Sequence, residues 1–137
     1  METTGYSGTP LAKKLGIKEA HAVLLVNEPP HYLELFADFP QHITFLDSPS
    51  NGAADFIHLF CTRYADLEIQ ALTLIKALKK TGMLWVSWPK GSSKIPTDLK
   101  REPIREHLLS IGLVDVKVCA VDKDWSGLKF VYRLKDR

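Results

Sequence analysis

The sequence predicts an α/β fold: a doubly wound, mainly parallel six-stranded sheet that ends in an antiparallel hairpin. Two observations lead to this prediction. Along most of the 137 residues, apolar runs of strand length alternate with segments of helical periodicity. Only the short segment 122–127 separates the last two apolar runs, which suits a hairpin. Because neither an internal repeat nor a linker interrupts the pattern, we expect one domain over residues 1–137.

The first half of the chain is expected to hold two short helices, over 9–16 and 30–38, and three strands, over 21–27, 42–46 and 55–61. Thr9 as N-cap, Pro10 at the first helical position and Gly16 as the stop signal delimit the first helix. Only 48–54 separates the second strand from the third, which is too short for the usual parallel crossover. Either this connection is stretched without a helix or the second strand is short.

The second half is expected to hold a helix over 64–80, a strand over 83–88, a helix that ends at Gly112, and strands over 113–121 and 128–134. Apolar residues at helical spacing and lysines in the last turns define the long helix, and Gly82 closes it. The next helix begins between Asp98 and Pro103, since proline fits only the first turn of a helix.

Composition excludes several classes of protein. Two cysteines do not make a disulfide framework, and the longest apolar run, 22–26, is too short to span a bilayer. The first ten residues lack the basic and apolar regions of a signal peptide, so the expected location is the cytoplasm. The net charge of +2 is divided unevenly. Residues 1–68 carry 4 basic and 9 acidic side chains, and residues 69–137 carry 14 basic and 7 acidic ones. This division favours an anion-binding second half, or simply solvated helix faces and strand edges.

Residues 55–89 resemble the second half of class I S-adenosylmethionine-dependent methyltransferases, in which an acidic–aromatic pair opens a strand that leads to an amphipathic helix and another strand. A second resemblance, to a family of small uncharacterised bacterial proteins known only as a domain of unknown function, spans the chain. It rests on GYSGTPLAKKLGI (5–17), WPK (88–90), TDL (97–99), GLVDVKVCAVD (112–122) and WSGLKFV (125–131). The two resemblances imply a Rossmann-like, methyltransferase-like fold but carry no activity.

The end of the first strand departs from the methyltransferase pattern, which has an acidic residue and a glycine-rich turn there. The first strand ends in Asn27-Glu28-Pro29-Pro30, which offers no glycine and two residues without an amide donor. Asp47, after the second strand, is a candidate for the carboxylate that would hold ribose hydroxyls, or it only caps a turn. No cofactor is therefore expected, and S-adenosylmethionine is disfavoured without being excluded.

Ligands of open α/β sheets bind beyond the carboxyl ends of the strands, so the residues that follow the strands are the candidate ligand-binding residues. Three N-terminal residues with hydroxyl or ammonium groups are added, because they precede or begin a helix. The candidate set is Ser7, Thr9, Lys13, Asn27, Glu28, Thr62, Arg63, Trp88, Lys90, Ser92, Ser93, Asp122, Trp125 and Ser126.

The segment WPKGSSK (88–94) is the best single candidate, because its hydroxyls and ammonium groups suit phosphate or carboxylate. The alternative for it is a flexible basic loop. For Asp122 and Asp124 there are two interpretations: an acid–base pair beside Trp125, or solvated residues of a hairpin loop. No catalytic residue is assigned, and the five histidines show no spacing that predicts a metal site.

Three function classes remain open. The favoured one is a module that binds a small ligand or an anion on a methyltransferase-like scaffold without being an active methyltransferase. The others are a divergent S-adenosylmethionine-dependent methyltransferase and an interaction domain that binds a protein, a second copy of the chain or a nucleic acid. Nucleic acid ranks last because the basic residues are not interleaved with aromatic ones, and no membrane partner is expected. The sequence leaves open whether a reaction is catalysed.

Overall fold

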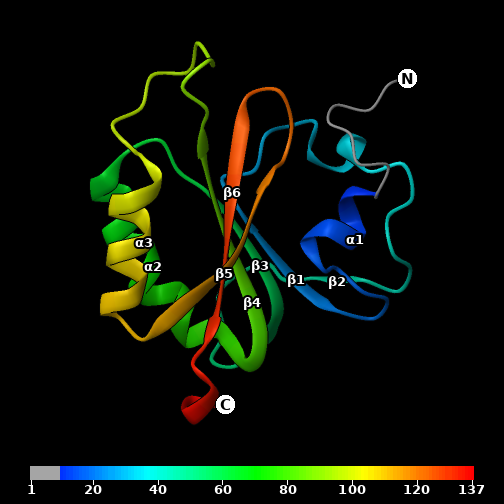
Figure 1. Ribbon diagram of the computed structural model, residues 1–137. Helices are drawn as coiled ribbons and strands as arrows, with labels where there is room; N and C mark the ends of the chain where they lie inside the picture. Colours follow the sequence, from blue (N-terminus) through cyan, green and yellow to red (C-terminus); the bar gives the residue numbers. More distant parts are fainter. Residues whose placement is uncertain (1–9) are drawn as a thin grey trace.

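The computed structural model describes residues 10–137. In chain order its helices and strands are α1 (Leu11–Leu15), β1 (Ala22–Val26), the 3-10 helix η1 (Tyr32–Leu35), β2 (Thr44–Phe45), β3 (Ala54–Phe60), α2 (Tyr64–Ala77), β4 (Leu78–Pro89), α3 (Arg101–Ser110), β5 (Leu113–Ala120), β6 (Trp125–Tyr132) and the 3-10 helix η2 (Leu134–Asp136). The strands form one sheet in the order β2-β1-β3-β4-β6-β5 (Figure 1). Strands β1 to β4 are parallel, and β6 is antiparallel to both β4 and β5. The predicted α/β sheet with its C-terminal hairpin is confirmed.

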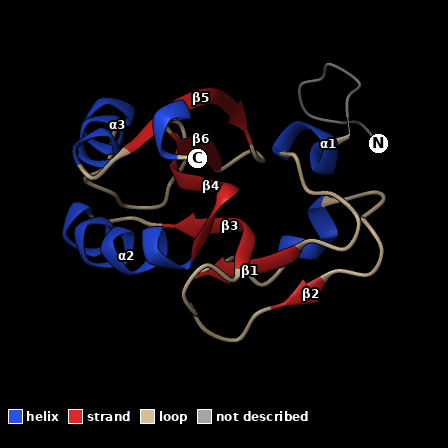
Figure 2. Cartoon of the chain, turned by 90° about the horizontal axis from the view of Figure 1, so that it is seen from below, coloured by secondary structure: helices blue, strands red, loops and turns tan. Residues whose placement is uncertain are grey.

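The sheet is covered on both faces. Helices α2 and α3 lie on one face, and α1 and η1 lie on the other (Figure 2). Trp88 belongs to the core under α2 and α3, whereas Trp85 belongs to the core under α1. The Trp85 indole N–H donates a hydrogen bond to the Leu15 carbonyl (2.7 Å), which ties α1 to the sheet. Within residues 10–137, no helix is both long and apolar enough to cross a membrane.

The prediction that the long helix continues to Lys80 and is closed by Gly82 is wrong. Helix α2 ends at Ala77, and β4 begins at the next residue. The reason is the neighbouring strand: the Lys79 ammonium binds the Asp55 carboxylate of β3 (3.0 Å). Gly82 serves close packing within the strand, since a Cβ there would lie 2.9 Å from the Asp55 carbonyl oxygen.

Residues 30–38 form only the short 3-10 helix η1, so the predicted helix is corrected. Phe36 already has extended backbone (φ −105°, ψ 124°), which ends the helical turn. The predicted strand over 42–46 shrinks to the two exposed residues of β2. The segment 46–53, which connects β2 to β3, contains no helix. Both alternatives for this connection therefore hold: the second strand is short, and the crossover is made without a helix.

The remaining predicted boundaries shift by a few residues. Helix α1 ends at Leu15, and Gly16, with a φ of +90°, is the expected left-handed residue that stops it. Pro10 is its N-cap instead of its first helical residue, and Thr9 lies outside the described residues. Strand β6 begins at Trp125, so Trp125 and Ser126 are strand residues and the hairpin loop is shorter than predicted.

Asp55 joins three strands and provides a test of the fold. Its carboxylate accepts hydrogen bonds from the Ala22 amide (2.8 Å) and the Lys79 ammonium (3.0 Å). Burial raises the pKa of Asp55, but these two hydrogen bonds outweigh burial and leave the pKa below its usual value. The carboxylate therefore stabilises the fold above about pH 4, and this contribution is lost as the pH falls through the lowered pKa.

We expect Asp55→Asn to lower the free energy of unfolding by about 1–3 kcal/mol at pH 7, because it weakens hydrogen bonds to a charged group. Urea unfolding at pH 7 and pH 3 measures the difference, which should shrink at the lower pH. Asp47→Asn, at an exposed position, is the matched control and should have little effect. Equal stability of the Asp55 variant and the wild type at pH 7 would contradict this account.

Candidate functional site

The turn after β1 is sharp without containing a glycine. Asn27 has a φ of +59°, in the left-handed region. Asparagine adopts this region several times more often than most other residues, because its short amide bonds locally. The missing glycine was one part of the sequence argument against a cofactor at this strand end, and the two prolines were the other. Asn27 provides the left-handed residue that glycine would otherwise provide, whereas the two prolines remain.

The two prolines that follow determine what the turn becomes. Pro29 and Pro30 have no amide hydrogens, so this segment cannot present the row of free amides found at a helix N-terminus. The Tyr32 amide donates to the Pro29 carbonyl (3.0 Å), and the Glu34 amide donates to the His31 carbonyl (3.0 Å). These bonds close η1 directly against the end of β1.

A buried chain of hydrogen bonds attaches η1 to the sheet. The Tyr32 hydroxyl bonds His58 Nδ1 (2.9 Å), and His58 Nε2 bonds the Ser87 hydroxyl (2.7 Å). His58 and Ser87 are fully buried, and Tyr32 is nearly so. Burial lowers the pKa of His58 to about 3, so the imidazole is neutral at pH 7 and uses one nitrogen as donor and the other as acceptor. The chain fixes η1 relative to β3 and β4.

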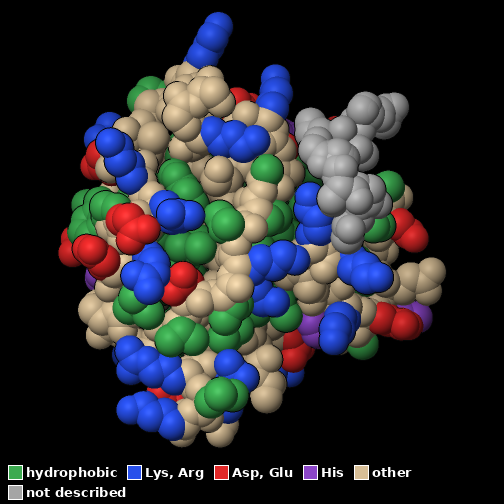
Figure 3. Space-filling model, in the orientation of Figure 1, with side chains coloured by type: hydrophobic (Ala, Val, Ile, Leu, Met, Phe, Trp, Pro, Cys, Tyr) green, Lys and Arg blue, Asp and Glu red, His purple; other side chains and the backbone are tan. Residues whose placement is uncertain are grey.

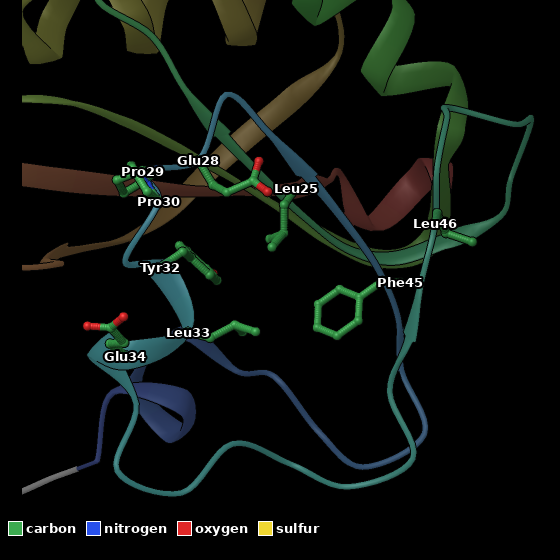
Figure 4. Close-up of a pocket in the computed structure, with 9 residues that line it drawn as sticks. All are labelled: Leu25, Glu28, Pro29, Pro30, Tyr32, Leu33, Glu34, Phe45 and Leu46. Carbon is green, nitrogen blue, oxygen red and sulfur yellow. The ribbon is translucent and has the colours of Figure 1, made fainter.

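A pocket of about 400 Å³ opens between β1, η1 and β2 (Figure 4). It is called here the β1–η1 pocket. It is lined by Leu25, Glu28, Pro29, Pro30, Tyr32, Leu33, Glu34, Phe45 and Leu46. The Leu33 and Phe45 side chains point toward one another across the hollow, and the Glu28 carboxylate lies at its upper side, whereas the Glu34 carboxylate turns away.

The walls of this pocket are apolar, and its charge is acidic. The Phe45 ring is 47% exposed and stacks on Phe39 with 5.9 Å between ring centroids. Burial raises the pKa of Tyr32, and the negative charge of Glu28 raises it further, so the Glu28 carboxylate is close enough to act on the hydroxyl. The pocket can therefore hold a flat apolar group together with a cation or a set of hydroxyl donors.

A second group of predicted residues meets where the β4–α3 loop touches the β5–β6 hairpin. The Lys90 amide donates to the Asp124 carbonyl (2.8 Å), and the Ser93 hydroxyl donates to the Asp124 carboxylate (3.1 Å). One oxygen of Asp122 accepts the Asp124 and Trp125 amides, and the other bonds His31 Nε2 (3.3 Å). The structure thus brings Lys90 next to the residue before Trp125, and it uses Asp122 to shape the hairpin turn.

Other predicted residues lie around a hollow of about 550 Å³, called here the β4–α3 hollow. It is lined by Trp88, Pro89, Lys90, Gly91, Ser93, Ile95, Thr97, Asp98, Leu99, Lys100 and Arg101. The Thr97 hydroxyl donates a hydrogen bond to the Thr62 carbonyl (2.6 Å), and Arg63 is the N-cap of α2. Asp98 accepts the Tyr64 amide (2.8 Å), so its charge is engaged at the start of α2.

The rest of the predicted set is not part of these two places. Ser92 lines a neighbouring hollow with Lys94 and Lys123, and Ser126 pairs with Trp88 in the sheet. Lys13 is exposed on α1. Ser7 and Thr9 lie outside the described residues.

Sequence reasoning missed the apolar walls of the β1–η1 pocket and the hydrogen-bond chain behind them. Leu33, Phe45 and His58 come from three segments whose positions depend on the tertiary fold, and no spacing connects them. The one available signal was Asn27, the residue that most readily replaces glycine in a left-handed turn.

The described residues provide little support for metal or thiol chemistry. Within 10–137, no three His, Cys, Asp or Glu side chains gather in a way that could hold a metal ion. Both cysteines are free thiols, and Cys61 is buried. Burial raises the pKa of Cys61 to about 12, and the charge of Asp66 contributes, so Cys61 stays protonated at pH 7.

Comparison with known proteins identifies the fold. No protein-family model and no curated sequence matches the chain. Among solved structures, an S-adenosylmethionine-dependent methyltransferase from Aquifex aeolicus is similar with a TM-score of 0.65 and 16% identity, over 88% of this chain and 86% of that one. A TehB-like S-adenosylmethionine-dependent methyltransferase from Corynebacterium glutamicum has a TM-score of 0.59 and 12% identity, over 90% and 85% of the two chains.

A third similar structure is the Burkholderia thailandensis 1,6-didemethyltoxoflavin-N1-methyltransferase, with bound 1,6-didemethyltoxoflavin and S-adenosylhomocysteine. Its TM-score is 0.54 at 13% identity, over 89% of this chain and 74% of that one. These likenesses confirm the methyltransferase-like fold that the sequence resemblance implied. At such low identity they describe the fold alone.

The pKa of His58 gives a test of the hydrogen-bond chain that joins Tyr32, His58 and Ser87. The unfolded chain takes up a proton at His58 below about pH 6.5, whereas the folded chain excludes it until about pH 3. Stability is therefore fully present above pH 6.5 and falls as the pH is lowered. At about 1.4 kcal/mol per pH unit, His58 should account for a loss of about 2 kcal/mol between pH 7 and pH 5.

We expect His58→Gln to be less stable at pH 7 but to show a flatter dependence over this range. Urea unfolding at several pH values measures both quantities. His42→Gln, at an exposed histidine, is the control and should keep the wild-type slope. An unchanged slope in the His58 variant would show that this imidazole is not the titrating group.

Proposed function

We propose that this protein binds S-adenosylmethionine, or a closely related adenosyl compound, in the β1–η1 pocket. The observation that carries the proposal is an acidic–apolar pocket beside a left-handed turn at the carboxyl end of β1. From β1 the chain crosses to β2 on one side and then to β3 on the other. Ligands of open α/β sheets bind at such a switch point. The similar methyltransferase structures support the same class of ligand.

The residues of the pocket fit the chemistry of an adenosyl group. Leu33 and Phe45 provide apolar surface for a purine ring, and aromatic stacking favours flat groups. The Glu28 carboxylate is a suitable acceptor for ribose hydroxyls and a suitable partner for a cationic group. When bound, S-adenosylmethionine would supply an activated methyl group. The role of this chain's own residues would be to hold and orient it.

Two features set this pocket apart from a glycine-rich cofactor loop. Pro29 and Pro30 provide no amide donors, and the exposed Asp47 is not among the residues that line the pocket. The polar part of the binding energy therefore depends on side chains, with Glu28 as the central one. This dependence makes the proposal easy to test by substitution.

We expect isothermal titration calorimetry to detect S-adenosylmethionine binding with a Kd of roughly 0.1 mM or tighter. Glu28→Gln removes the charge and should weaken binding about tenfold, the effect of one charge-assisted hydrogen bond. Glu68→Gln is the matched control, because it removes an exposed carboxylate on α2 that does not line the pocket, and it should bind like the wild type. S-Adenosylhomocysteine, which lacks the cationic sulfonium, distinguishes binding of the charge from binding of the nucleoside.

Absence of binding to both compounds at millimolar concentration would refute the proposal. Equal weakening by the two glutamate variants would also refute it, since the effect would then come from general charge and not from the pocket.

The β4–α3 hollow supports a second candidate function, the binding of a small anion. Three cationic side chains line it, from Lys90, Lys100 and Arg101. The one acidic side chain there, Asp98, is occupied by the Tyr64 amide. The Ser93 and Thr97 hydroxyls already donate to Asp124 and to the Thr62 carbonyl, so the cationic side chains would provide the binding. This arrangement suits a phosphate or carboxylate group.

The anion proposal can be tested with inorganic phosphate as the probe and amide chemical shifts as the readout. We expect saturable shifts centred on residues 90–101, and their loss in Lys90→Gln/Lys100→Gln. Lys76→Gln/Lys135→Gln removes the same charge from α2 and η2 and should retain the shifts. Shifts spread evenly over exposed lysines would indicate screening by salt and would remove the second candidate.

A further inference from the structure

Four lysines gather where α1 lies against the β5–β6 hairpin. They are Lys14, Lys18, Lys117 and Lys129, and they are called here the lysine face. Lys117 and Lys129 are directly opposite each other in the antiparallel pairing of β5 and β6. The Lys117 ammonium donates to the Lys14 carbonyl (2.9 Å), and the Lys129 ammonium lies 3.6 Å from where a Cβ on Gly16 would be. Figure 3 shows lysine and arginine side chains gathered over β5, β6 and α1.

The described residues provide no ion-pair partner for these lysines. Within residues 10–137, none of the four forms an ion pair. The nearest acidic residues along the chain have other partners: Glu19 binds His42 (3.0 Å), and Asp115 binds Arg105 (3.1 Å). Like charges opposite each other in a sheet are destabilising. Burial lowers the pKa of Lys129, and the nearby positive charges of Lys117 and Lys18 lower it further.

A purely structural role explains only part of the lysine face. The bond from Lys117 to the Lys14 carbonyl satisfies an acceptor at the C-terminal end of α1, where a cation is favourable. The ammonium groups of Lys18 and Lys129 make no hydrogen bond to any of residues 10–137. Three of the four ammonium groups, those of Lys14, Lys18 and Lys129, therefore have no hydrogen-bond or ion-pair partner among residues 10–137. Lys18 and Lys129 are in addition close to like charges.

We propose that the lysine face binds the phosphate backbone of a nucleic acid. A row of ammonium groups on a strand pair and an adjoining helix matches a linear polyanion, and the four lysines lie outside the pocket and hollows described above. Lys–phosphate contacts need no stacking aromatic side chains, so the lack of interleaved aromatic residues does not oppose this mode. It predicts binding that is independent of base sequence and strongly dependent on salt.

An anionic membrane is a weaker match for the same charges. Stable attachment to a membrane surface also needs apolar side chains that insert among the lipids. The large exposed hydrophobic residues of the described chain are Leu33, Phe45, Ile69, Leu72, Val116, Val118 and Leu134. Val116 and Val118 lie on β5 on either side of Lys117 and line a hollow with Arg101 and Arg105, and none of the others lies on α1, β5 or β6. Vesicle binding is therefore an outcome of the test that opposes the proposal.

The test measures fluorescence anisotropy of labelled 20-nucleotide RNA and DNA, single-stranded and duplex, from 50 to 200 mM salt. With four phosphate contacts to a duplex, affinity should fall on the order of a hundredfold over this range. Lys18→Gln/Lys129→Gln removes two of the three lysines whose ammonium groups make no hydrogen bond to residues 10–137. It should reduce the slope of log K against log salt by about 2. Lys76→Gln/Lys135→Gln, the charge-matched control, should leave the slope unchanged.

The proposal is overturned if none of the four nucleic acids binds at 50 mM salt, or if the control pair loses as much affinity as the test pair. It is also overturned if vesicles containing phosphatidylserine bind more tightly than nucleic acid and with the same dependence on Lys18 and Lys129. Thermal unfolding gives an independent readout. Relief of repulsion should leave the melting temperature of the test variant unchanged or raise it, and a lower value would assign these lysines to folding instead.

Discussion

The buried hydrogen-bond chain from Tyr32 through His58 to Ser87 is the constraint on which the candidate pocket depends. It joins η1, β3 and β4 by two hydrogen bonds of 2.9 Å and 2.7 Å in a region closed to water. A buried polar group is tolerated only if it is paired, so the three side chains have to be placed together or not at all. In a typical doubly wound sheet, a full helix after the first strand would cover this region. Here a single turn of 3-10 helix does so, and the hydrogen-bond chain supplies the attachment that a longer apolar helix face would otherwise provide.

The presence of η1 in place of a full helix has a direct consequence for the space beside β1. Because η1 is short and anchored at Tyr32, the space between it and β2 remains open and becomes the β1–η1 pocket. The same two prolines that prevent a helix N-terminus at this point also prevent amide recognition of an anion. What remains is the Glu28 carboxylate at the end of β1, so the pocket selects for groups that donate hydrogen bonds or carry positive charge. The pocket of this methyltransferase-like fold thus lies at the switch point of the sheet, and its polar lining comes from side chains.

The elements that the sequence predicted well are those with strong local signals. The apolar runs of β1 and β3, the stop at Gly16 and the closely spaced hairpin led to the correct sheet. The errors occurred where tertiary contacts override local preference. Gly82 follows the helical pattern and looks like a helix stop, yet its lack of a side chain allows the close approach of β3. Lys79 was predicted to be helical, but it lies in β4 and forms an ion pair with Asp55. The pocket could not be predicted, because its walls come from residues brought together by the fold. Glu28 and Asn27 were predicted because they directly follow a strand.

The uneven charge of the sequence becomes a spatial division in the structure. The acidic first half forms β1, η1 and β2 at one edge of the sheet, and the basic second half forms β5 and β6 at the other. The segment from α1 to Lys18 is the exception, since Lys14 and Lys18 belong to the acidic half but lie beside the β5–β6 hairpin. Their position adds positive charge beside strands that are already positively charged, and this repulsion is electrostatically unfavourable. A fold that needed only to balance its own charges would place Glu28 or Glu34 beside those lysines. The observed separation keeps an acidic pocket and a basic face apart, so the two surfaces can attract ligands of opposite charge without neutralising each other.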